Sequence, residues 1–71
     1  MQNKNEFILK VGSKVRQIRI EKNYSIEKLS LKSGISYSQL IRIEKGKINT
    51  SIYQLFQIAQ HLEIEIEELF K

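Results

Sequence analysis

The stretch from residue 33 to residue 46 carries the strongest local structural signals in this 71-residue chain. Gly34 suits a backbone position with positive φ, and the Ser36 hydroxyl can cap the free N–H groups of a following helix. Gln39 completes a Ser-x-x-Gln capping box, and Gly46 suits the residue that ends the helix. These signals predict a tight turn followed by a short helix.

This short helix, expected at about 36–45, would bury one face and leave the other open. Leu40 and Ile43 are predicted to face the core. The positions predicted to face outward are Tyr37, Ser38, Ile41, Arg42 and Lys45. A short exposed helix that follows a glycine-containing turn has the shape that enters a DNA major groove.

The composition limits the class of protein. At 71 residues, with 41% hydrophobic and 28% charged residues and no proline, the chain suits one small helical domain. The absence of cysteine excludes disulfides and thiolate metal sites. No apolar run is long enough to span a membrane, and the N-terminus leads into no signal-peptide core. We therefore expect a cytoplasmic protein that does not enter membranes.

The charge is unevenly distributed. Residues 1–50 carry 11 Lys and Arg against 4 Glu, whereas residues 51–71 carry 1 Lys against 4 Glu. A basic first part and an acidic end suggest that one face meets a polyanion. The alternative is a solvated surface whose charge is simply uneven.

Four further helices are predicted around the short one. Residues 1–6 read as a flexible arm with Asn5 as an N-cap, followed by helices at 7–22, 26–32 and 52–62. The helix at 52–62 should bury Ile52, Leu55, Ile58, Ala59 and Leu62, and Gln54 should complete a second capping box. Residues 62–66 alternate as a strand would, but Ile66, Leu69 and Phe70 have helical spacing, which favours a short fifth helix. The expectation is an all-α, five-helix domain over residues 7–71.

An ordered set of residues from Ser25 to Phe70 resembles the phage repressor and Cro-like (XRE-type) helix-turn-helix family. The matching positions are Leu29, Ser30, Gly34-Ile35-Ser36, Ile43 to Lys47, Asn49 to Ser51, Leu55, Ile58, Ala59, Leu62 and Glu68 to Phe70. The resemblance covers nearly the whole chain. It implies a lambda-repressor-like fold whose helix-turn-helix consists of the helices at 26–32 and 36–45.

The resemblance also implies roles in binding double-stranded DNA. Base reading falls to Tyr37, Ser38, Arg42 and Ile41, with Arg42 suited to guanine. Contacts with phosphates fall to residues around the two helix starts and after the recognition helix, which are Ser25, Lys28, Ser36, Lys45, Lys47, Asn49 and Thr50. The alternatives are that Ile41 is merely tolerated and that the loop residues are simply solvated.

Family members pair an arginine late in the first helix with the glutamate at the end of the recognition helix, here Arg19 and Glu44. Two positions depart from the family pattern. Ile26 stands where a glutamine usually bonds a phosphate, so that contact is lost. Thr50 stands where proline is usual, which makes the loop before the last long helix less rigid.

Apolar residues near the C-terminus suggest a homodimer, as is common in the family. The expected interface residues are Ile64, Ile66, Phe70, Tyr53 and Phe56. The alternative is that the apolar residues at the end of the chain, Ile64, Ile66, Leu69 and Phe70, only seal the small core. A two-fold dimer would place its recognition helices about 34–36 Å apart and require a palindromic operator.

Catalysis is not expected. All acidic residues are Glu, the single His61 lies on a helix, and no metal-ligand cluster or nucleophile with its base can be assembled. The sequence predicts a transcriptional regulator that acts without cofactor or small-molecule ligand, with repression as the expected mode. The rival hypothesis is a protein-interaction module or an antitoxin-like partner protein with the same fold.

Overall fold

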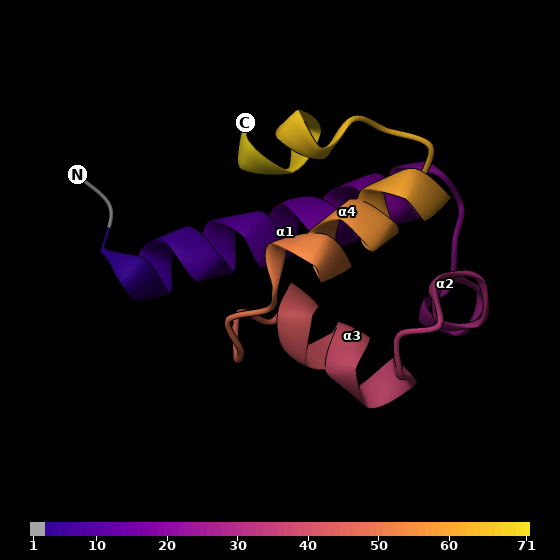
Figure 1. Cartoon of the computed structure of the whole chain (residues 1–71), viewed down its shortest axis with the longest axis horizontal. Helices are drawn as coiled ribbons and strands as arrows, with labels where there is room; N and C mark the ends of the chain where they lie inside the picture. The colour runs from indigo at the N-terminus through magenta and orange to yellow at the C-terminus, as the bar shows by residue number, and fades with distance from the viewer. Residues whose placement is uncertain (1–2) are drawn as a thin grey trace.

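The computed structural model describes residues 3–71, and within them the chain is all-helical, without strands. No helix in this range is long and apolar enough to cross a bilayer. The elements in chain order are α1 (Lys4–Glu21), α2 (Ile26–Ser33), α3 (Tyr37–Glu44), α4 (Ile52–His61) and the 3₁₀ helix η1 (Ile66–Phe70) (Figure 1).

The helices enclose one apolar core. α3 and η1 pack against α1, α2 packs against both α3 and α4, and α4 also packs against η1. α2 lies at the end of the molecule remote from the start of α1 (Figure 1). Every helix contributes to the core, whose buried side chains are Val11, Val15, Ile18, Leu29, Ile35, Leu40, Ile43, Leu55, Ile58, Ala59, Leu62 and Leu69.

Three serine caps fix where the shorter helices begin. Ser25, Ser36 and Ser51 each precede a helix and accept a hydrogen bond from the backbone N–H three residues later, at 3.0, 3.2 and 3.1 Å. These bonds satisfy donors that a helix N-terminus leaves free. The starts of α2, α3 and α4 are therefore determined by local sequence, as predicted.

The beginning of α1 differs from the prediction. Asn3, not Asn5, is the N-cap: its side chain accepts from the Glu6 backbone N–H at 2.8 Å, and the helix begins at Lys4. The predicted flexible arm over residues 1–6 is therefore wrong for residues 4–6. Residues 1 and 2 lie outside the described residues. Both asparagines are good caps, and with the earlier one the helix begins three residues before the predicted start at residue 7.

Two predictions near the C-terminal part also need correction. Ile52, expected to be buried, is 72% exposed, because the inward face of α4 starts with Leu55. The segment predicted as a fifth helix is the 3₁₀ helix η1, so the described part of the chain has four α-helices. Within η1, Leu69 is fully buried and holds the segment on the core.

Candidate nucleic-acid interface

The turn between α2 and α3 is held by two serines of α2. The Ser30 hydroxyl donates to the Ile35 carbonyl at 2.6 Å, and the Ile35 N–H donates to the Ser33 hydroxyl oxygen at 3.2 Å. Gly34 adopts a positive φ of 77°, which glycine tolerates without steric cost. Ile35 is buried in the core. Together these contacts fix the angle at which α3 leaves the turn.

α3 divides its side chains as the sequence predicts. Leu40 and Ile43 are buried, which leaves the opposite face open. Tyr37 is 47% exposed, and Ser38 and Arg42 are exposed as well. Ile41 is half-buried, so it presents only part of its side chain. The face offers an aromatic ring, a hydroxyl and a guanidinium from two successive turns.

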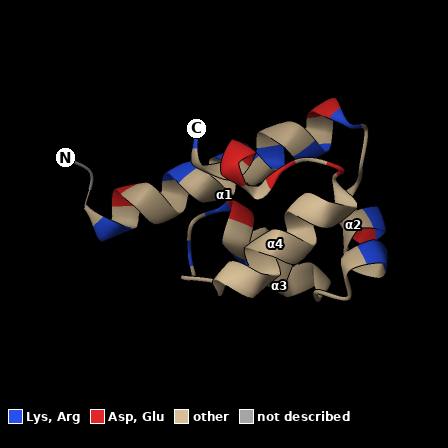
Figure 2. Cartoon of the chain, turned by 45° about the horizontal axis from the view of Figure 1, so that its top comes forward, with Lys and Arg blue, Asp and Glu red and all other residues tan. Residues whose placement is uncertain are grey.

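Most candidate phosphate-binding residues are accessible around this face. The exposed ones are Ser25, Lys28, Ser36, Lys45, Lys47 and Asn49. Thr50 is half-buried, and its hydroxyl donates to the Gln54 side-chain oxygen. Figure 2 shows basic residues along α1 and α2, whereas α4 carries no Lys, Arg, Asp or Glu and the end of the chain is acidic. Positive charge is thus concentrated away from α4 and η1.

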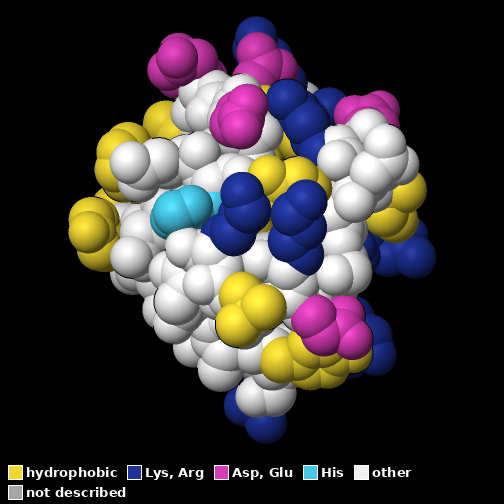
Figure 3. Space-filling model, turned by 90° about the vertical axis from the view of Figure 1, so that its right-hand side faces the viewer, with side chains coloured by type: hydrophobic (Ala, Val, Ile, Leu, Met, Phe, Trp, Pro, Cys, Tyr) yellow, Lys and Arg dark blue, Asp and Glu magenta, His cyan; other side chains and the backbone are white. Residues whose placement is uncertain are grey.

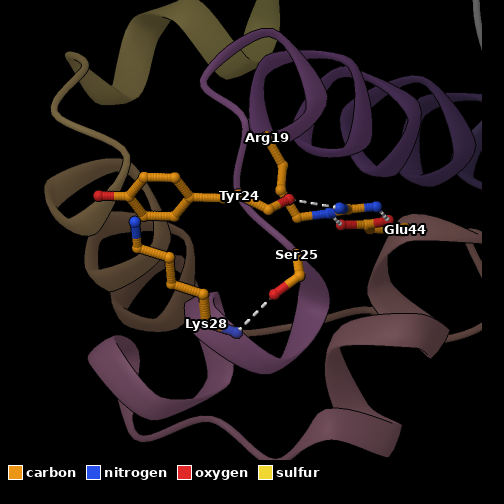
Figure 4. Close-up of polar contacts among 5 residues, drawn as sticks. All are labelled: Arg19, Tyr24, Ser25, Lys28 and Glu44. Carbon is orange, nitrogen blue, oxygen red and sulfur yellow. Dashed lines mark hydrogen bonds and ion pairs between the residues drawn. The ribbon is translucent and has the colours of Figure 1, made fainter.

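Tyr24, which the sequence did not single out, organises two lysines of α2. Its ring lies 4.3 Å from the Lys28 ammonium and 5.5 Å from that of Lys32. Figure 3 shows Lys and Arg side chains at the end of the molecule where α2 lies, next to acidic and apolar side chains, and Figure 4 shows Lys28 extending toward the Tyr24 ring. Such cation–π contacts contribute only about 0.5–1 kcal/mol at exposed sites, so an anion can compete for either ammonium.

Arg19 and Glu44 join α1 to the C-terminal end of α3. The Arg19 Nε donates to Glu44 Oε2 at 2.7 Å, and Nη2 donates to Oε1 at 3.1 Å (Figure 4). Nη1 donates to the Tyr24 backbone oxygen at 2.7 Å. The two side chains are only 11% and 5% exposed. The guanidinium is therefore occupied within the protein, in the structural role that the resemblance implied.

Gln39 and Gln54 bond to each other, a contact that the sequence reasoning missed. The Gln39 Nε2 donates to Gln54 Oε1 at 2.8 Å, which joins the first turns of α3 and α4. Both glutamines were predicted to complete capping boxes. Their backbone N–H groups do bond the capping serines, but these side-chain atoms bond across the helices instead. The Ser-x-x-Gln spacing flagged both residues and gave no sign that they pair.

The predicted dimer residues fall into two groups. Ile64, Ile66 and Phe70 are half-buried against the protein's own core, and the Phe70 ring stacks on Phe7 with centroids 6.1 Å apart. Tyr53 and Phe56 instead project from α4, 65% and 49% exposed, with their rings stacked at 6.3 Å. Of the five predicted interface residues, the two on α4 are therefore the ones that expose apolar surface.

Comparison with known proteins gives consistent matches. The HTH_3 helix-turn-helix family model matches residues 15–69. The HTH-type transcriptional regulator SlrR of Bacillus subtilis is 41% identical over 61 residues, which are 84% of this chain and 40% of SlrR. The chain thus spans less than half of that relative.

Two solved structures are similar in both fold and sequence. The restriction-modification controller protein C.AhdI from Aeromonas hydrophila superposes with a TM-score of 0.86 at 35% identity, over 89% of this chain and 96% of that one. The structure of SinR, a master regulator for biofilm formation, in complex with DNA gives a TM-score of 0.81 at 32% identity, over 86% and 98% of the two chains.

Proposed function

Because the chain belongs to the HTH_3 (XRE-type) helix-turn-helix family of transcriptional regulators, which are not enzymes, we propose that it represses transcription by occupying a palindromic operator as a homodimer. The observation that carries this proposal is the open face of α3, which presents Tyr37, Ser38 and Arg42 at an angle fixed by the turn before it. The match to SinR, whose structure contains DNA, supports it.

Base reading is assigned to the exposed side chains of α3. Arg42 is the main reader, since a guanidinium can bond guanine O6 and N7 together. Ser38 reads a neighbouring base edge, and Tyr37 packs on a thymine methyl or bonds a phosphate. The half-buried Ile41 adds an apolar edge that suits a thymine methyl.

Phosphate contacts are assigned to residues that surround this helix. The hydroxyls of Ser25 and Ser36 each accept a bond from the backbone, which leaves their hydrogens free to donate to phosphate oxygens. The Thr50 hydroxyl donates to Gln54, so a phosphate contact at Thr50 falls to its backbone N–H. The remaining anchors are Lys28, Lys45, Lys47 and Asn49.

Two copies of the chain are proposed to meet through Tyr53 and Phe56 on α4. These stacked rings are the exposed aromatic pair of the described residues. Ile64, Ile66 and Phe70 then pack mainly against the protein's own core and contribute little to the interface. Large aromatic side chains contribute much of the binding energy at protein interfaces.

Selection from a random pool of DNA duplexes tests the proposed function directly. We expect enrichment of a palindrome whose half-sites are one helical turn apart. Three lysine anchors in each subunit give six in a dimer, so log K should fall with log salt at a slope of about −5. Enrichment of no sequence together with a flat salt dependence would favour the protein-interaction alternative.

Arg42→Ala and Lys47→Ala should separate base reading from anchoring. Arg42→Ala is expected to relax base preference about tenfold at one position of each half-site. Lys47→Ala should weaken all sequences alike and make the salt slope shallower by about two in a dimer. Binding to a library of single-base operator variants at several salt concentrations measures both effects. Equal losses on every sequence for both variants would contradict this division.

Phe56→Glu should separate the subunits without disturbing the core, because the side chain projects from α4. We expect a monomer in sedimentation experiments and at least a tenfold loss of affinity for the full operator, while binding to an isolated half-site changes little. Gln17→Glu places the same charge on an exposed position of α1, outside the proposed interface, and serves as the control. A dimer that persists in Phe56→Glu would place the interface elsewhere.

A further inference from the structure

One side-chain oxygen holds together the two parts of the proposed DNA interface. Gln54 Oε1 accepts from Gln39 Nε2 at 2.8 Å and also from the Thr50 hydroxyl. Gln39 lies in the first turn of α3, and Thr50 ends the loop between α3 and α4. All three residues are half-buried. The oxygen thus links the recognition helix to the loop that carries Lys47 and Asn49.

We propose that Gln54 is a positioning residue that keeps the phosphate-binding loop in register with the base-reading helix. The inference rests on the proposed function. An amide oxygen has two lone pairs, and both are used here, one for each segment. Because the amide is planar, the two donors are held in a fixed direction relative to each other. The loop cannot shift along the recognition helix without breaking one of the bonds.

This role concerns specificity more than folding. The caps of α3 and α4 use the hydroxyls of Ser36 and Ser51, which remain when the Gln54 side chain is removed. The buried core contacts of both helices remain as well. Attraction to phosphates depends mainly on charge and tolerates a displaced loop. Base reading instead requires base edges and phosphates to be met at the same time.

The test compares affinity for the selected operator with affinity for an unrelated duplex of equal length. Gln54→Ala is expected to lower the ratio of the two affinities about tenfold. The affinity for the operator should fall, and the affinity for the unrelated duplex should stay the same. Gln54→Glu keeps oxygen acceptors for both donors, so it should keep the ratio within about twofold while its negative charge weakens both duplexes. Gln60→Ala, a matched change at an exposed position of α4, should change neither affinity.

Two further variants remove the groups that donate hydrogen bonds to Gln54 Oε1. Gln39→Ala removes one donor, and Thr50→Val removes the other while leaving a side chain of similar shape. Each should lower the affinity ratio, and Gln39→Ala combined with Gln54→Ala should lose no more than Gln54→Ala alone, since both changes break the same bond. These variants also cover the case in which Gln54→Ala is poorly folded.

The outcomes are distinguishable. An equal loss on both duplexes in Gln54→Ala would make this residue a direct phosphate contact and overturn the positioning role. An unchanged ratio in a folded Gln54→Ala protein would overturn it as well, and would leave the proposed function intact. A wild-type protein that prefers no sequence would overturn the proposed function itself, and this inference with it.

Discussion

Glu44→Ala is expected to destabilise the fold by about 3–5 kcal/mol. The change removes the carboxylate that accepts two hydrogen bonds from Arg19 and leaves that guanidinium, 11% exposed, with the Tyr24 carbonyl as its remaining partner. A buried charge without its counter-ion is costly, because it has lost its hydration and gains little in return. Domains of this size are stable by only about 4–10 kcal/mol. The midpoint of urea unfolding should therefore move to a much lower urea concentration.

Removing both charges should be less harmful than removing one. In an Arg19→Met, Glu44→Leu double variant no charge is left unpaired, and apolar replacements of similar size often restore stability. The double variant is therefore expected to unfold at higher urea concentration than Glu44→Ala. Glu21→Ala, on an exposed position of α1, should stay within about 0.5 kcal/mol of the wild type. If Glu44→Ala and Glu21→Ala had the same free energy of unfolding, the Arg19–Glu44 ion pair would not contribute to the stability of the fold.

The parts of the fold that depend on neighbours in sequence were predictable. The serines at 25, 36 and 51 mark helix starts through bonds that span three residues, so they can be read from the chain. The inward face of α3 follows from helical periodicity. Errors arose where two local solutions compete. Asn3 and Asn5 are both suitable caps, and local sequence does not decide between them; the structure uses Asn3.

The contacts that organise the candidate site were less predictable, because they join distant segments. Gln39 and Gln54 carry a spacing that indicates capping boxes, and nothing local shows that their side chains meet. The position of Tyr24 against the α2 lysines has no sequence signal either. The Arg19–Glu44 pair spans 25 residues and was accessible only through the resemblance to a family. Composition and periodicity do not encode such pairs.

The backbones of α1 and α3 come close together at Gly12, a residue type that weakens the middle of a helix. A Cβ placed there would lie 2.0 Å from the Ile43 carbonyl oxygen and 3.1 Å from that of Glu44. The first distance is about 1.3 Å shorter than an ordinary C···O contact of about 3.3 Å. Because the obstacle is backbone, no side-chain rotation relieves it. Glycine at this position therefore allows the α3 backbone to pack directly against α1.

Gly12→Ala should consequently destabilise the protein by about 3 kcal/mol, the upper part of the range for overpacked cores, although alanine favours helices by about 1 kcal/mol over glycine. Two controls isolate the collision. Ser13→Ala, at an exposed position of α1, should be neutral or slightly stabilising. At Gly34 an added Cβ would contact no atom within 4 Å, but the residue has a φ of 77°. Gly34→Ala should therefore destabilise the protein by about 1–2 kcal/mol. Thermal unfolding should rank Gly12→Ala lowest; if it ranked with Ser13→Ala, α1 and α3 would not be in close backbone contact.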